Sequence, residues 1–128
     1  MILGIKTDQP EATICLFNDK NIEAYSWQAY RQLSDTIHLK IQDLLNKYNI
    51  EYKNLTGVVV FIGPGSFTGL RMGITVANTL AYSLNIPIVG TNGKDWFKTG
   101  LDMLKNGNSS QIIQPEYGAP VHITQPKK

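Results

Sequence analysis

A chain of 128 residues with 42% hydrophobic and 17% charged residues has the length and composition of one soluble globular domain. Its net charge of +2 is too small to indicate a nucleic-acid-binding surface of its own. A single cysteine, Cys15, excludes an internal disulfide framework and is expected in the core. With neither a membrane-spanning run nor a signal peptide in evidence, we expect a cytoplasmic protein without membrane contact.

Three short apolar segments near the N-terminus predict strands at residues 2–6, 12–17 and 22–27. Because the connections between them are short, we expect an antiparallel meander. A helix is predicted from about residue 34 to 48, with Ser34 as its N-cap. Its apolar stripe is formed by Ile37, Ile41, Leu44, Leu45 and Tyr48.

A buried strand, a tight loop and a second helix are expected next. Residues 57–62 are β-branched and aromatic, and residues 67–84 carry apolar side chains at helical spacing. In the loop between them, Pro64 fixes one φ angle and Gly65 can adopt a conformation that other residues avoid. Ser66 is placed to cap the helix.

The remaining residues predict a short fifth strand at 88–90, parallel to the fourth because a helix joins the two. Thr91 or Asn92 is the expected cap of a last helix, and prolines then favour an extended tail. We therefore expect one domain over residues 1–106 and an extended tail over 107–128. The fold class is α/β, and the order of elements is that of a ribonuclease-H-like half of an actin-like ATPase, with a mixed five-stranded sheet.

The glycine-rich loop fits neither of the two common phosphate-binding motifs. A P-loop requires a lysine that no register here supplies, and a dinucleotide fingerprint requires glycine where Thr68 stands. The general possibility of anion binding by amides at a helix start stays open beside a purely structural turn. We find no catalytic triad and no metal-ligand spacing, so we expect no catalytic residue and no metal site in this chain.

Small residues recur every four positions on the second helix, at Gly69, Gly73, Ala77 and Ala81. A glycine inside a helix costs about 1 kcal/mol relative to alanine, so two of them suggest a packing requirement. This narrow side of the helix can face either the protein's own sheet or a helix of another chain.

The loop and the helix start resemble the signature of the bacterial TsaB (YeaZ) family. The resembling residues are Gly63, Pro64, Gly65, Ser66, Phe67, Thr68, Gly69, Leu70 and Arg71, followed by Gly73. Similarity extends over residues 1 to about 105, although the chain has the length of the N-terminal half-domain alone, which we interpret as a short form. Lys6 and Leu33 depart from the family pattern, which has aspartate and histidine there; a lysine cannot ligate Mg²⁺.

The resemblance implies a non-catalytic scaffold that binds and activates TsaD in the threonylcarbamoyladenosine modification of tRNA. It also implies that TsaE and tRNA are met only through the complex, and that ATP and metal belong to partner subunits, with no cofactor on this chain. The TsaD interface would use the two predicted helices, through Ile37, Ile41, Leu45, Gly69, Met72, Gly73, Val76, Ala77 and Leu80. Two alternatives are a homodimer that pairs through the small-residue side and a minimal nucleotide-binding enzyme domain.

Overall fold

The computed structural model describes residues 1–29, 32–109 and 113. Apart from residues 107–109 and Ile113, the predicted tail lies outside this part of the chain. In chain order, the elements are β1 (Ile2–Lys6), β2 (Glu11–Phe17), β3 (Ile22–Gln28), α1 (Leu33–Lys47), the 3-10 helix η2 (Tyr52–Asn54), β4 (Gly57–Phe61), α2 (Phe67–Leu84), β5 (Ile88–Thr91) and α3 (Trp96–Lys105).

The strands form one five-stranded sheet in the order β3-β2-β1-β4-β5. β2 pairs antiparallel with both β1 and β3, whereas β4 pairs parallel with both β1 and β5. The meander and the parallel crossover predicted from the sequence are therefore confirmed, as is the ribonuclease-H-like fold class.

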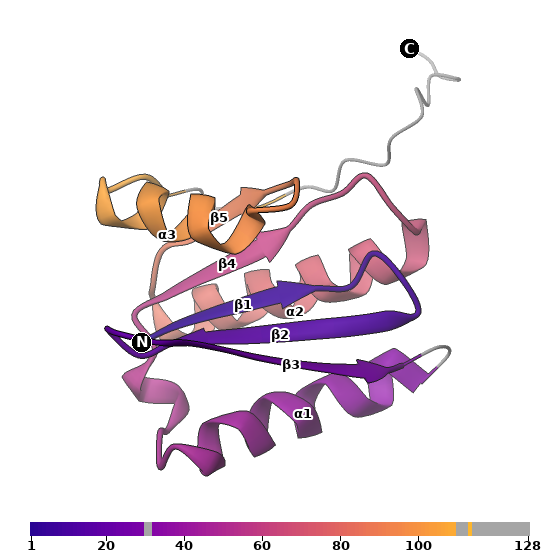
Figure 1. Cartoon of the computed structure of the whole chain (residues 1–128), viewed down its shortest axis with the longest axis horizontal. Helices are drawn as coiled ribbons and strands as arrows, with labels where there is room; N and C mark the ends of the chain where they lie inside the picture. The colour runs from indigo at the N-terminus through magenta and orange to yellow at the C-terminus, as the bar shows by residue number, and fades with distance from the viewer. Residues whose placement is uncertain (30–31, 110–112, 114–128) are drawn as a thin grey trace.

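The helices cover the two faces of the sheet unequally (Figure 1). α1 and α2 lie side by side on one face, above the completely buried Leu3, Ile5, Val58 and Val60. On the other face, α3 packs over β4 and β5, where Gly100 lies so close to Val59 that a side chain would collide. No described helix of the molecule is long and apolar enough to cross a membrane.

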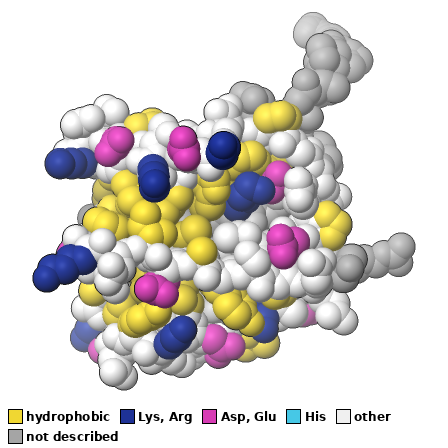
Figure 2. All heavy atoms as spheres, in the orientation of Figure 1, with side chains coloured by type: hydrophobic (Ala, Val, Ile, Leu, Met, Phe, Trp, Pro, Cys, Tyr) yellow, Lys and Arg dark blue, Asp and Glu magenta, His cyan; other side chains and the backbone are white. Residues whose placement is uncertain are grey.

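On this second face, α3 leaves the β2 and β3 half of the sheet uncovered within the described residues. Ile2, Phe17 and Ile22 are cross-strand partners and form a row there, with Ile22 41% exposed at its outer end. Figure 2 shows hydrophobic side chains gathered on this part of the surface. Cys15 nevertheless belongs to the core as predicted, and its burial raises the pKa of the thiol to about 12.

Two of the predicted helix caps are wrong, and one is confirmed. The hydroxyl of Ser66 accepts a hydrogen bond from the amide of Gly69 at 3.4 Å and caps α2. α1 begins at Leu33 without a side-chain cap, because Ser34 is already inside the first turn. α3 begins only at Trp96, because Thr91 is still paired in β5; its hydroxyl instead donates to the carbonyl of Trp96 at 2.7 Å.

Candidate functional site

The loop between β4 and α2 is built against the two residues that follow β1. Gly63 adopts a φ of 114°, so the left-handed position in this loop is Gly63 and not the predicted Gly65. Gly65 is required for another reason, since a side chain there would collide with Asp8. The amide of Ser66 donates to the carbonyl of Asp8 at 3.0 Å, which fastens the loop to the end of β1.

The small residues of α2 serve the same contact. The hydroxyl of Thr7 donates to the carbonyl of Gly69 at 2.6 Å, and Thr7 is only 2% exposed. A side chain at Gly69 would collide with the backbone of Thr7, and one at Gly73 with its hydroxyl. The expectation that Gly69, Gly73 and Ala77 admit a partner helix is thus corrected, because Gly69 and Gly73 are filled by Thr7 of the same chain and Ala77 is buried in the core. A homodimer through this side of α2 has no exposed strip to use.

Lys6 and Asp8 form an ion pair where β1 ends. The two charged groups are 2.6 Å apart, and the Lys6 ammonium also lies 4.7 Å from the centre of the Phe61 ring. Asp8 is 8% exposed, so its charge is held in place chiefly by this lysine. The described residues contain no group of three His, Cys, Asp or Glu side chains that could hold a metal ion.

Anion binding at the start of α2 is poorly supported by this geometry. The amides of Ser66 and Gly69 already donate to oxygens of the protein, at Asp8 and Ser66. The Cβ and backbone of Asp8 lie against Gly65, at the contact that excludes a side chain there. Two of the amides that an anion at this helix start could use are therefore already bonded within the protein.

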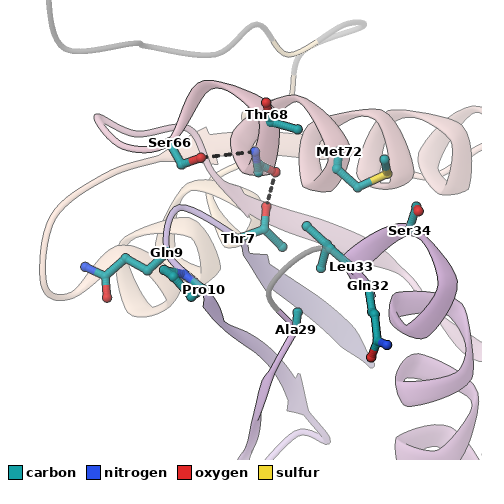
Figure 3. A pocket seen from close by; sticks show the side chains of 11 residues that line it. Thr7, Gln9, Pro10, Ala29, Gln32, Leu33, Ser34, Ser66, Thr68 and Met72 are labelled. Atoms are coloured by element: carbon teal, nitrogen blue, oxygen red, sulfur yellow. Dashed lines mark hydrogen bonds between the residues drawn. The ribbon is translucent and has the colours of Figure 1, made fainter.

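A cleft of about 770 Å³ opens between the starts of α1 and α2. Figure 3 shows Thr7 between the two helices, with Leu33 of α1 and Met72 of α2 beside it. The lining is mainly apolar and includes Gly69, one of the predicted interface residues. The full lining consists of Thr7, Gln9, Pro10, Ala29, Gln32, Leu33, Ser34, Ser66, Thr68, Gly69 and Met72.

Most of the predicted interface side chains are inside the core. Those with 0 to 5% exposure are Ile37, Ile41, Leu45, Val76 and Ala77. Gly73 is also buried, so only Gly69, Met72 and Leu80 of the predicted set reach the surface in part. The apolar stripe of a helix packs on its own sheet first, which is why these residues are correctly apolar but wrongly placed at a partner surface.

Two exposed apolar residues on the helix layer were not predicted as interface residues. Leu39 on α1 is 59% exposed, and Tyr82 on α2 is 90% exposed. Leu39 lies on the side of α1 opposite the apolar stripe, which is a signal that the sequence does contain. The accessible apolar side chains of this layer include Leu33, Leu39, Met72, Leu80 and Tyr82.

Known proteins resemble the chain in both sequence and fold. The sequence model of the family TsaD, tRNA N6-adenosine threonylcarbamoyltransferase, matches residues 27–98. The tRNA threonylcarbamoyladenosine biosynthesis protein TsaB of Bacillus subtilis is 30% identical, over 88% of this chain and 59% of its own length. TsaB of Escherichia coli is 31% identical over 71% of this chain and 39% of its own length.

Among solved structures, YeaZ from Pseudomonas aeruginosa superposes with a TM-score of 0.68 at 22% sequence identity. The match covers 71% of this chain and 43% of the YeaZ chain. At this identity the likeness concerns the fold. The chain thus spans between 39 and 59% of the length of these three relatives.

Proposed function

Because the chain belongs to the TsaB (YeaZ) family, we propose that it acts in the biosynthesis of threonylcarbamoyladenosine in tRNA, as a non-catalytic subunit that binds a TsaD protein. In this proposal TsaE and tRNA meet the chain only within the TsaD complex. ATP and metal are bound by the partner subunits.

The observation that carries the proposal is the apolar cleft between the starts of α1 and α2. Its walls carry Leu33 and Met72, and the partly exposed Leu80 follows Met72 two turns along α2. A partner helix that lays its apolar side chains along such a cleft would bury them against Leu33 and Met72. Leu39 on α1 and Tyr82 on α2 are further exposed apolar side chains, one on each helix.

The chemistry at the end of β1 supports a role without catalysis. The ammonium group of Lys6 forms an ion pair with the Asp8 carboxylate. Because of this pair, the carboxylate is not free to coordinate a cation or to accept a proton from a substrate. The neighbouring amides of the loop are bonded within the protein. Binding of a partner requires none of these groups.

The test is a binding titration between this chain and TsaD from the same organism, with Met72→Asp as the disruptive variant. An aspartate in the cleft wall would have to be desolvated on binding, and we expect at least a tenfold loss of affinity. Met103→Asp is the matched control, because Met103 is equally half-buried but lies on α3. Equal affinities for parent and Met72→Asp would overturn the proposed surface, and no binding by the parent would overturn the proposed function.

A further inference from the structure

The chain treats the two edges of its sheet differently. At the β5 edge, the hydroxyl of Ser109 accepts a hydrogen bond from the amide of Ile88 at 3.3 Å. The side-chain amide of Asn78 then binds both backbone groups of Ile113, each at 3.0 Å. Ile113 is 8% exposed and packs against Gly90, where a side chain would lie 2.9 Å from it. The chain after α3 thus returns to this edge and is fastened there.

At the opposite edge, alternate residues of β3 have backbone groups without a partner among the described residues. The amide of Ala29 donates to Pro10 at 2.8 Å, and that of Asn18 donates to Asn21 at 3.2 Å. These two bonds fix the alternation of the antiparallel ladder, so the odd-numbered residues of β3 bond to β2. The even-numbered residues therefore point their N–H and C=O groups outward. They are Ile22, Ala24, Ser26 and Gln28.

The sequence of β3 lacks four of the features by which proteins usually prevent strand addition. Such features are a proline, a lysine, a bulge or a very short strand. β3 is seven residues long, contains neither proline nor lysine, and pairs with β2 in one unbroken register. Two of the four large apolar residues that are exposed in the described structure, Ile22 and Tyr25, lie on this strand.

We propose that β3 pairs antiparallel with β3 of a second copy, about a two-fold axis at Tyr25, and so joins the two sheets. The inference goes beyond the proposed function and uses other residues than the cleft between α1 and α2. It is also a different dimer from the one that the small residues of α2 suggested.

The sequence of β3 is complementary to itself in this register. With Tyr25 opposite Tyr25, all seven residues are paired, and Ala24 of one copy faces Ser26 of the other. The outward-pointing residues then face one another, so each of their pairs can exchange two hydrogen bonds. The one charged residue of the strand, Glu23, faces Trp27, so no like charges are paired within the two strands.

The side chains around the axis suit the same arrangement. Tyr25 stacks on Trp27 of its own strand, with ring centres 6.2 Å apart, and the Lys40 ammonium lies 5.4 Å from the centre of the Tyr25 ring. Tyr25 is 43% exposed, so a second Tyr25 across the axis would cover the exposed part of its ring. The contacts with Trp27 and Lys40 already hold the ring in position before the second copy binds. Paired side chains approach each other most closely at such a non-hydrogen-bonded position.

The test is sedimentation velocity of the full chain from about 5 to 200 µM, with Ser26→Pro as the disruptive variant. Proline at position 26 removes an outward N–H group and the surface hydroxyl bond of Ser26 to Thr13, but no backbone bond to β2, so the fold should persist while the dimer weakens at least tenfold. Ser26→Thr is the matched control and should dimerise as the parent does. A parent that stays monomeric at 200 µM overturns the proposal.

Cross-linking locates the axis independently of the proline variant. In Tyr25→Cys, the two introduced thiols face each other at a spacing that suits a disulfide, so oxidation should give a covalent dimer. Tyr82→Cys, on the exposed side of α2, is the control and should stay monomeric. If Ser26→Pro dimerises as the parent does and Tyr25→Cys does not cross-link, the dimer uses another surface and the proposal is overturned. Ser26→Pro should bind TsaD as the parent does, which separates this inference from the proposed function.

Discussion

The two sides of α2 differ in the size of their residues and in what those residues contact. The side that faces β1 is narrow, with Gly69 and Gly73 in contact with Thr7. The outward side carries larger apolar residues, among them Met72 and Tyr82, that the fold leaves accessible. The comparison teaches that regularly spaced small residues mark where a helix meets its own sheet. Candidate partner contacts are the large residues that lie outside that pattern.

The largest expected effect comes from filling the narrow side. Gly73→Leu forces a branched side chain onto the hydroxyl of Thr7, and we expect destabilisation by about 3 kcal/mol or more, as in overpacked cores. Thr75→Leu on the exposed side of α2 is the control, with a change of about 0.5 kcal/mol or less. Chemical denaturation measures both. Similar stabilities for the two variants would mean that the two sides do not differ in packing.

A smaller loss of stability is expected when Thr7 still packs against α2 but its hydrogen bond to Gly69 is removed. Thr7→Val keeps the shape of the buried side chain and loses the bond to the carbonyl of Gly69, which should cost about 1–2 kcal/mol. Thr13→Val is the control, because its hydroxyl bonds to Ser26 at the surface and should matter less. If the two variants lost the same free energy of unfolding, the buried hydrogen bond of Thr7 would matter no more than a surface one.

The smallest expected change in stability concerns Cys15, on the other face of the sheet. Burial raises the pKa of this thiol to about 12, whereas an unfolded cysteine ionises near 8.5. The folded state therefore holds the proton longer, so stability is complete below about pH 8.5 and falls as the pH rises toward 12. Relative to Cys15→Ala, we expect a loss of about 1 kcal/mol by pH 9.5 in denaturation curves.

The same thiol gives a direct measure of burial. At pH 8, Cys15 in the folded chain should react with a thiol reagent far more slowly than the introduced cysteine of Tyr82→Cys, since the thiolate is the reactive form. Rates that match would show that the uncovered half of the sheet opens readily to solvent.

The sequence predicted the strands and helices closely because their signals are periodic. The alternating residues around Ile14 and the helical spacing around Ile74 leave little choice of element. The caps at Ser34 and Thr91 were misplaced because a polar residue near a helix start is common, and only the backbone decides which residue is the cap.

The candidate site was predicted less well than the fold. Periodicity showed that α2 has a narrow side, but not that Thr7, more than 60 residues earlier, would occupy it. The loop motif was recognised, although the left-handed residue is Gly63 and Gly65 is held by its contact with Asp8. Long-range contacts of this kind depend on sheet register, which a single sequence does not encode locally.

The double hydrogen bond between Asn78 and Ile113 has a practical consequence for how this molecule is handled. Because both bonds go to the backbone, the polypeptide is anchored at a fixed point beside β5, at the opposite end of the sheet from β3. A label attached close to Ile113 would therefore lie at the β5 edge and leave β3 accessible, whereas one attached near Asn21 would lie directly beside the open strand.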